Sequence, residues 1–388
     1  MMAGPLHGTR VIEIGGLGPA PFCCMVLADL GADVLRVERP DKAPPAEAIA
    51  VHDTLSAYDF QSRGRLSAGV DLKHPDGAAL IQRLASGADV FVEGFRPGVA
   101  ERLGIGPDRL CGDNPRLVYG RMTGWGQDGP LADQPGHDLT YLALSGVLAH
   151  IGRRDQPPTV PLNLLADYGG GGVMLALGIC AALVERGASG EGQVVDAAMV
   201  DGAPLLMTPI IGAMASGFWS DDRGTNLLDS GAPFYDVYAC SDGGFVAVAA
   251  MEPQFWAALV DGLGWSGDDS IPDQNDQARW PELRDRLARE FATRSRDEWA
   301  VHFEHRGACV APVLTMREAQ AHPHMQARGT FVEVAGAVQP RPAPRFSRTD
   351  GEITIPPQLA AANTDEVLDR WGVTDDERAA LRAGGAIS

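Results

Sequence analysis

The sequence has 388 residues, enough for two or three domains at roughly 100–200 residues each. Hydrophobic residues make up 45% and charged residues 21%, which is ordinary for a folded globular protein. The formal net charge of −19 argues against non-specific binding to nucleic acids or anionic membranes. No apolar run reaches the roughly 18 residues of a membrane span, and no signal peptide is recognisable. We therefore expect neither nucleic acid nor membrane as a partner.

The first elements predict a βαβ unit. Residues 10–14 have the pattern of a buried strand, residues 22–30 that of a helix, and residues 33–38 that of a second strand. Such a unit forms a parallel sheet with a right-handed crossover. Gly16-x-Gly18 resembles the start of a dinucleotide-binding fingerprint, but Pro21 stands where the third glycine belongs, so we do not expect a nicotinamide cofactor.

Strands and helices continue to alternate along the chain, which predicts a doubly wound, Rossmann-like α/β domain over residues 1–224. Residues 41–62 are expected to form a loop. The further predicted elements are a strand at 68–72, a helix at 75–85, a strand at 89–95, a helix at 97–103, a strand and glycine turn at 117–126, and a strand running into a helix at 192–206.

The pattern changes after residue 224. Residues 234–250 predict a hairpin around a Ser-Asp-Gly-Gly turn, residues 253–305 predict amphipathic helices, and residues 308–315 predict a strand. We expect a smaller α+β domain over residues 225–325. The C-terminal segment 326–388 is expected to return to the large domain or to a partner chain.

The cysteines and the cationic residues suggest where the protein works and what it binds. Six scattered cysteines without CxxC spacing are typical of buried thiols in a reducing cytoplasm, so we expect a cytoplasmic protein. Nearly all cationic side chains are arginines, whose planar donors suit anions. One short window is a candidate anion-binding cluster: Arg36, Arg39, Lys42, Arg63, Arg65 and Lys73.

One histidine and one distant carboxylate are the main catalytic candidates. His137 begins a predicted helix, where the helix dipole favours a neutral imidazole able to accept a proton. Asp167 precedes Tyr168 and the glycines 169–172. A simple capping role remains open for each. Held across one pocket, the two groups suit removal of a proton from one face of a carbon and its return to the other. Glu252, after a predicted strand, could orient the histidine.

The sequence also resembles the alpha-methylacyl-CoA racemases of the family III CoA-transferase superfamily. Segments in the same order carry the resemblance, among them LADLGADVLRVERP, GVDLKHPDGAALIQRL, FRPGVAERLGIGP, GHDLTYLALSGVL, PLNLLADYGGGG and AMEPQFW. The resemblance spans about residues 5–350. It implies that His137 and Asp167 are the two acid/base residues and that Glu252 supports the histidine.

The resemblance further implies a set of substrate- and CoA-contacting residues in the large domain. These are Arg39, Val70, Asp71, Leu72, Lys73, Arg96, Gly136, Asp138, Leu139, Thr140 and Tyr141. The basic loop departs from the family pattern, because Arg63-Gly64-Arg65 is followed by Leu66. The 41–62 segment does not align with it.

By this resemblance we expect an isomerase of lipid and fatty acid metabolism. It would epimerise the α-carbon of 2-methyl-branched acyl-CoA thioesters through an enolate-like intermediate, with CoA as part of the substrate and no cofactor. The family forms interlocked homodimers, which would bring Glu252 to the partner's histidine. Two alternatives remain: a CoA-transferase with Asp167 as nucleophile, and an acyl-CoA-binding protein without turnover.

Overall fold

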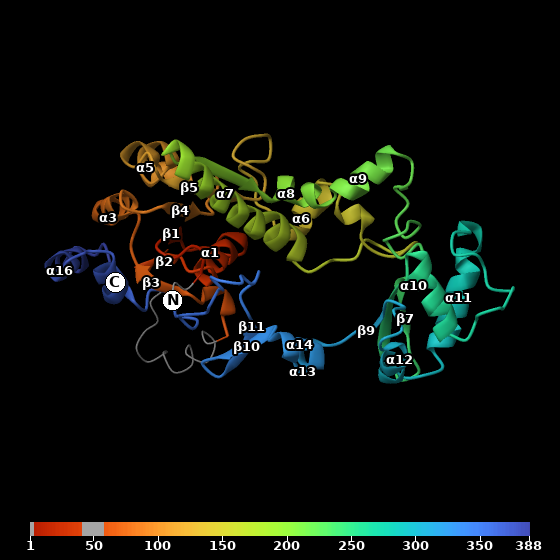
Figure 1. Cartoon of the computed structure of the whole chain (residues 1–388). Coiled ribbons are helices and arrows are strands. Elements are labelled where there is room, and N and C mark those ends of the chain that lie inside the picture. The colour runs from red at the N-terminus through yellow and green to blue at the C-terminus, as the bar shows by residue number, and fades with distance from the viewer. Residues whose placement is uncertain (1–3, 41–57) are drawn as a thin grey trace. The chain divides into compact units, whose positions relative to one another are not determined.

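The computed structural model of the protein describes residues 4–40 and 58–388 (Figure 1). These residues form two compact units. Unit 1 comprises the described residues of Met1–Ser145 with Leu162–Leu206 and Gln326–Ser388, and unit 2 comprises Gly146–Pro161 with Met207–Met325.

These units differ from the expected domain boundaries at residues 146–161 and 207–224, which belong to unit 2. Long-range polar contacts explain the first segment. Arg153 forms an ion pair with the buried Asp236 at 2.7 Å, and Arg223 donates a hydrogen bond to the carbonyl of Ala149. A pattern confined to neighbouring residues cannot reveal such pairings, because their partners lie 83 and 74 residues away.

A six-stranded sheet forms the centre of unit 1, and its strand order is β3-β2-β1-β4-β5-β6. All five pairings in it are parallel. This order is that of a doubly wound sheet and confirms the expected α/β class. The strands are β1 (Arg10–Ile14), β2 (Asp33–Glu38), β3 (Arg65–Gly69), β4 (Val90–Glu93), β5 (Val118–Thr123) and β6 (Val194–Ala198).

Helices cover both faces of this sheet. On one face Ile12, Leu35 and Phe91 pack with the buried residues of α3. On the other, a Cβ on Gly120 would touch the side chains of Leu175 and Ile179, so helix α7 lies against β5 there. The helices of unit 1 before residue 326 are α1 (Pro19–Asp29), η3 (Phe60–Ser62), α3 (Pro75–Ala85), α4 (Val99–Arg102), α5 (Pro107–Asp113), α6 (Asp138–Leu144), η5 (Leu164–Val173), α7 (Met174–Ser189) and α8 (Met199–Leu206).

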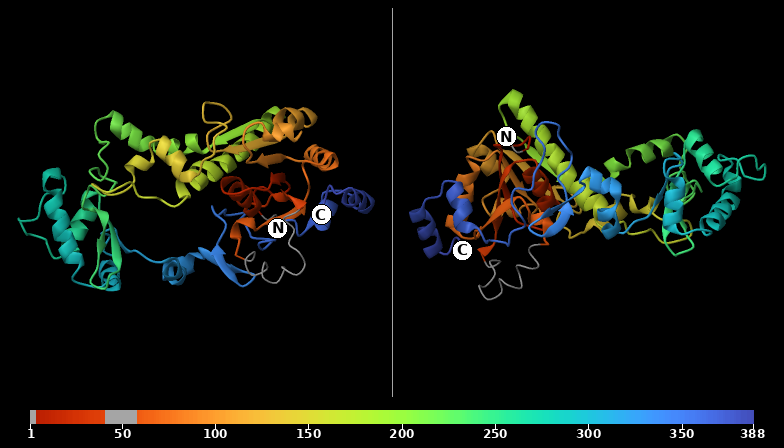
Figure 2. Two further views of the ribbon diagram at one scale, coloured as in Figure 1. Left: turned by 180° about the vertical axis from the view of Figure 1, so that it is seen from behind. Right: turned by 60° about the horizontal axis from the view of Figure 1, so that its bottom comes forward.

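The C-terminal segment packs on unit 1 beside β3 (Figure 2). Val367, Leu368 and Trp371 are buried in the same core as Ile12 and Leu35. The last residues pair with the end of β3, since Val70 bridges Ile387 and the N–H of Ser388 donates to the carbonyl of Gly69. The segment contains β10 (Phe331–Val334), β11 (Ala337–Pro340), α15 (Thr364–Arg370) and α16 (Asp375–Ala383); α14 (Pro323–Arg328) leads into it.

The third strand was expected to start at residue 68, and this was wrong. The expected anion-binding cluster was also too large, because three of its arginines pair with carboxylates. Strand β3 begins at Arg65, because the buried guanidinium pairs with Glu13 at 2.5 Å. Arg63 is likewise buried and pairs with Asp29 at 2.6 Å. Arg36 pairs with Glu38. These arginines neutralise buried carboxylates and are not available as an open anion site; Lys42 lies outside the described residues.

The glycines 169–172 lie within a long apolar helix. Elements η5 and α7 form one helical run, Leu164–Ser189, whose mean hydropathy reaches 1.5, and by length and composition alone it could cross a membrane. Buried helices of soluble proteins meet the same criterion. This run contacts α1, α8 and strands β5 and β6 of unit 1.

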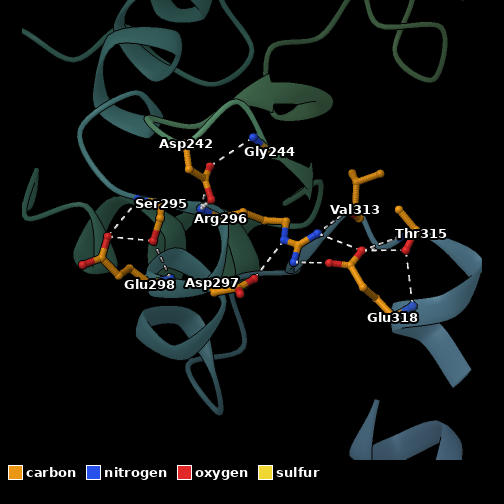
Figure 3. Close-up of polar contacts among 9 residues, drawn as sticks. All are labelled: Asp242, Gly244, Ser295, Arg296, Asp297, Glu298, Val313, Thr315 and Glu318. Carbon is orange, nitrogen blue, oxygen red and sulfur yellow. Dashed lines mark hydrogen bonds and ion pairs between the residues drawn. The ribbon is translucent and has the colours of Figure 1, made fainter. Parts of the chain in front are cut away.

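Unit 2 contains the predicted hairpin, a third strand and helices α10, α11 and α12, which share one core that includes Trp299, Phe291 and Leu287. Around α12, a capping box joins Ser295 and Glu298, and Arg296 pairs with Glu318 (Figure 3). Its elements are η4 (Leu148–His150), α9 (Thr208–Ala215), β7 (Tyr235–Ala239), β8 (Phe245–Ala249), α10 (Pro253–Gly262), η6 (Gln277–Arg279), α11 (Trp280–Phe291), α12 (Arg296–Phe303), β9 (Val310–Pro312) and α13 (Met316–Ala321).

Candidate active site

A pocket of about 510 Å³ lies at the carboxyl ends of the strands of unit 1, and both catalytic candidates line it. In open α/β sheets this edge is where ligands bind. Its wall is formed by segments that follow β1, β4 and β5, by Met199 after β6, and by His137 and Asp167. The structure therefore brings together two groups that are far apart in the sequence.

His137 is the residue immediately before helix α6, in an extended conformation. Its backbone N–H donates to the hydroxyl of Thr140 at 2.9 Å, and this hydroxyl donates to the carbonyl of His137 at 2.7 Å. These bonds fix the start of the helix through Thr140, and His137 lines the pocket. Thr140 and Leu139, expected to touch substrate, do not line the pocket.

Asp167 lies in the first turn of η5, a π-helical stretch that continues into α7. π-Helical turns are rare and occur often at functional sites. One carboxylate oxygen accepts a hydrogen bond from the side-chain amide of Asn163 at 3.1 Å. Burial raises the pKa of the Asp167 carboxyl above its ordinary value; the Asn163 bond opposes this shift and the charge of Asp138 adds to it. A raised pKa suits a carboxyl group that must both accept and return a proton.

Asp138 is placed differently from the expected substrate contact. It is 4% exposed and does not line the pocket. One of its carboxylate oxygens accepts hydrogen bonds from the N–H groups of Ala166 and Asp167, at 2.8 and 2.9 Å. Asp138 thus links the start of α6 to the start of η5.

Tyr141 occupies a space that two glycines leave open. A Cβ on Gly124 would lie 2.1 Å from its ring, and one on Gly136 would lie 2.5 Å from it. The edge of the ring meets Trp125, with the centroids 4.8 Å apart. Burial raises the pKa of the Tyr141 hydroxyl; the charge of Asp167 adds to this and that of Arg96 opposes it. Arg96, which also lines the pocket, therefore acts on the same ring.

The glycine run after Asp167 serves helix packing. A Cβ on Gly170 would lie 2.6 Å from the backbone of Ala203 in α8, and one on Gly172 would lie 2.8 Å from the carbonyl of Pro19 in α1. These glycines are buried and let three helices approach closely. We therefore assign Gly170 and Gly172 a role in helix packing.

A second pocket of unit 1, of about 730 Å³, contains the remaining expected contacts: Arg39, Val70, Asp71, Leu72 and Lys73. Phe95 lines both pockets, so they adjoin at this residue. Its backbone N–H donates to Glu93 at 2.6 Å, and Arg121 pairs with both Glu93 and Glu101. Arg121 thereby connects strand β4, which precedes the loop Phe95–Gly98, with helix α4, which follows it.

Glu252, the expected partner of the histidine, lies in unit 2. It is the residue before helix α10, its side chain is exposed, and it makes no capping hydrogen bond with that helix. Its carboxylate therefore does not cap the N-terminus of α10.

Several residues that line the first pocket were not singled out in the sequence: Phe95, Trp125, Gln134 and Asn163. Asn163 had the clearest available signal, since it stands four residues before Asp167 in PLNLLAD and so faces it across one helical turn. The others have no signal in a single sequence, because the sheet topology alone brings them together.

The chain belongs to CoA-transferase family III, whose sequence model matches residues 6–363. It is 44% identical to the alpha-methylacyl-CoA racemase of Mus musculus over 96% of this chain and 94% of that protein. It is 31% identical to a succinyl-CoA–D-citramalate CoA-transferase of Chloroflexus aurantiacus over 99% of this chain and 98% of that protein. The crystal structure of a CaiB/BaiF family protein from Brucella suis superposes with a TM-score of 0.80 and 25% identity, covering 95% of this chain and all of that one.

Proposed function

We propose that the protein inverts the α-carbon of 2-methyl-branched acyl-CoA thioesters by two-base proton transfer. The observation that carries this proposal is the presence of His137 and Asp167 in one pocket of unit 1, in a chain 44% identical to the mouse racemase. Identity to the Chloroflexus transferase is 31%, which favours the racemase over a transferase.

The proposed reaction needs two groups of opposite protonation state. One of His137 and Asp167, as a neutral imidazole or a carboxylate, removes the α-proton, and the C–H electron pair moves into an enolate-like thioester. The other, as imidazolium or carboxylic acid, gives its proton to the opposite face of the carbon. The protonation states are exchanged at the end and the reverse reaction restores them. This chemistry needs no cofactor beyond the CoA of the substrate.

The second pocket supports a CoA ester as the substrate. Arg39 and Lys73 supply cationic groups there, which suits the phosphates of CoA, and Phe95 connects this pocket with the catalytic one. We assign the acyl end of the substrate to the pocket of His137 and the nucleotide end to that of Arg39. Arg96 would then face the thioester end.

We further propose that the protein is a homodimer and that Glu252 reaches the His137 of the partner chain, as the family resemblance implies. Large apolar side chains on α7 and α8 support a partner surface, because Leu177, Val184 and Leu205 are all more than half exposed. Burial of the Leu164–Ser189 run in a dimer interface would also explain why this helix is so apolar, without requiring that it cross a membrane. Light scattering on the wild type and on Val184→Glu tests this proposal.

Incubation of one 2-methylacyl-CoA epimer in D₂O, with a second free acid present, tests the reaction. The racemase incorporates deuterium at the α-carbon and yields both epimers. A CoA-transferase moves CoA to the second acid instead, after attack of Asp167 on the thioester. If the acyl-CoA binds but neither product forms, the protein is an acyl-CoA-binding protein without turnover. A cytoplasmic location stays a prediction that cell fractionation can test.

A further inference from the structure

One carboxylate joins the two elements that hold the catalytic candidates. His137 precedes α6, whereas Asp167 belongs to η5. In the sequence, residues 138–166 separate these two candidates. Asp138 connects the two elements, because it is the first residue of α6 and its carboxylate accepts hydrogen bonds from two backbone N–H groups of η5.

We propose that Asp138 is a positioning residue, whose side chain fixes the backbone of Asp167 relative to His137 and keeps a negative charge beside the Asp167 carboxyl. This inference rests on the proposed two-base reaction. It replaces the substrate contact expected from the sequence.

The geometry gives this bridge little freedom. Both hydrogen bonds go to the same oxygen and come from consecutive residues, so the two peptide units are held together. Asp138 is 4% exposed, and its other carboxylate oxygen is buried without a hydrogen-bond partner among the described residues. A charge in such a place is poorly screened by water.

The charge also acts on Asp167 directly. After burial, it is the main factor that raises the pKa of the Asp167 carboxyl, against the lowering effect of Asn163 and His137. A carboxyl group that must be an acid in one direction of the reaction benefits from this shift. Asp138 would thus act on both the position and the proton affinity of the catalytic carboxyl.

The Asp138→Asn variant separates charge from shape. Its amide oxygen can still accept both N–H groups, so the backbone is kept, while the negative charge is lost. For the epimer whose proton Asp167 removes, kcat/KM rises with pH through the pKa of that carboxyl. We expect this limb of the profile to move to lower pH, because less repulsion favours the carboxylate.

The Asp138→Ala variant removes the bridge itself. We expect kcat to fall by about 10²-fold, the usual result of misplacing a reacting group by about 1 Å, with KM little changed. Hydrogen–deuterium exchange of the Ala166 and Asp167 amides should become faster. This second measurement does not depend on turnover, so it decides on the bridge even if the wild type fails to racemise 2-methylacyl-CoA.

Asp133→Asn is the matched control, because Asp133 is an exposed aspartate near the pocket that does not line it. It should leave the pH profile and the exchange of both amides unchanged. A raised KM with unchanged kcat in Asp138→Asn would restore the substrate-contact role and overturn the proposal. So would an unshifted profile together with unchanged amide exchange in Asp138→Ala.

Discussion

Asn163 donates a hydrogen bond from its side-chain amide to the carboxylate of Asp167 over 3.1 Å, from one helical turn earlier in the chain. This bond stabilises the charged carboxylate and lowers its pKa, whereas burial and Asp138 raise it. The proton affinity of Asp167 is therefore set by opposing neighbours.

Removal of this amide should move the Asp167 limb in the direction opposite to that of Asp138→Asn. In Asn163→Ala the carboxylate loses a donor, its pKa rises further, and the acidic limb of kcat/KM moves to higher pH. A pH–rate profile measured with each epimer checks this prediction. An unmoved limb would mean that the bond is not formed in the free enzyme.

Both candidate bases should be needed in both directions of the reaction. His137→Ala and Asp167→Ala should each lower racemisation by about 10²–10⁴-fold, the usual contribution of a positioned acid or base. The rate of epimer formation in each direction measures this, and circular dichroism shows that the fold is kept. A variant that retains near-full turnover would identify its residue as a helix cap only.

Arg39 should act in binding more than in the chemical step. It lines the second pocket beside Lys73, and its planar guanidinium suits phosphate oxygens. Arg39→Ala should raise KM for the CoA ester and leave kcat nearly unchanged, as steady-state kinetics would show. Arg109→Ala is a matched control, since Arg109 is exposed on α5 and pairs with Asp113. A fall in kcat at unchanged KM would place Arg39 with the catalytic residues.

Glu252 should affect the histidine limb alone. If its carboxylate accepts a hydrogen bond from His137 of a partner chain, Glu252→Gln removes a charge that favours the imidazolium, so this limb should move to lower pH. The Asp167 limb should stay where it is. A profile identical to that of the wild type on both limbs would make Glu252 an ordinary exposed carboxylate.

The glycine contact between η5 and α8 should be sensitive to a single methyl group. A Cβ on Gly202 would lie 1.8 Å from the carbonyl oxygen of Gly170, so Gly202→Ala should cost about 1–3 kcal/mol of unfolding free energy through overpacking. Gly112→Ala is the control: it lies in α5 with nothing near its Cβ, and should be neutral or slightly stabilising. Urea unfolding of both variants measures the difference.

Most of the sheet of unit 1 could be predicted because strands such as β1, β2 and β4 are short buried runs bounded by turns. The strands at 10–14 and 33–38 and the helix at 75–85 are confirmed at both ends. Strand β3 was misplaced because Arg65 is charged, and only its distant partner Glu13 makes it a buried residue.

The same physical limit applies to the site. His137 and Asp167 could be singled out from their residue types together with the family resemblance, and the structure places both at one pocket. The role of Asp138 could not be predicted, because a carboxylate that binds backbone N–H groups 28 and 29 residues away leaves no trace in local spacing. The packing of the glycine run also depends on α1 and α8, whose approach only the folded chain reveals.

The pairing of residues 386–388 with the end of β3 makes one wall of the second pocket depend on a distant part of the chain. Val70 and Asp71 line the second pocket, and they bond to Ile387 and Ala386, while Gly385 lines the same pocket. Because residues 385–387 follow β6 at a great distance in the sequence, a chain made only as far as β6 lacks one wall of the proposed nucleotide site. We expect such a truncated chain to bind CoA more weakly than the whole of unit 1.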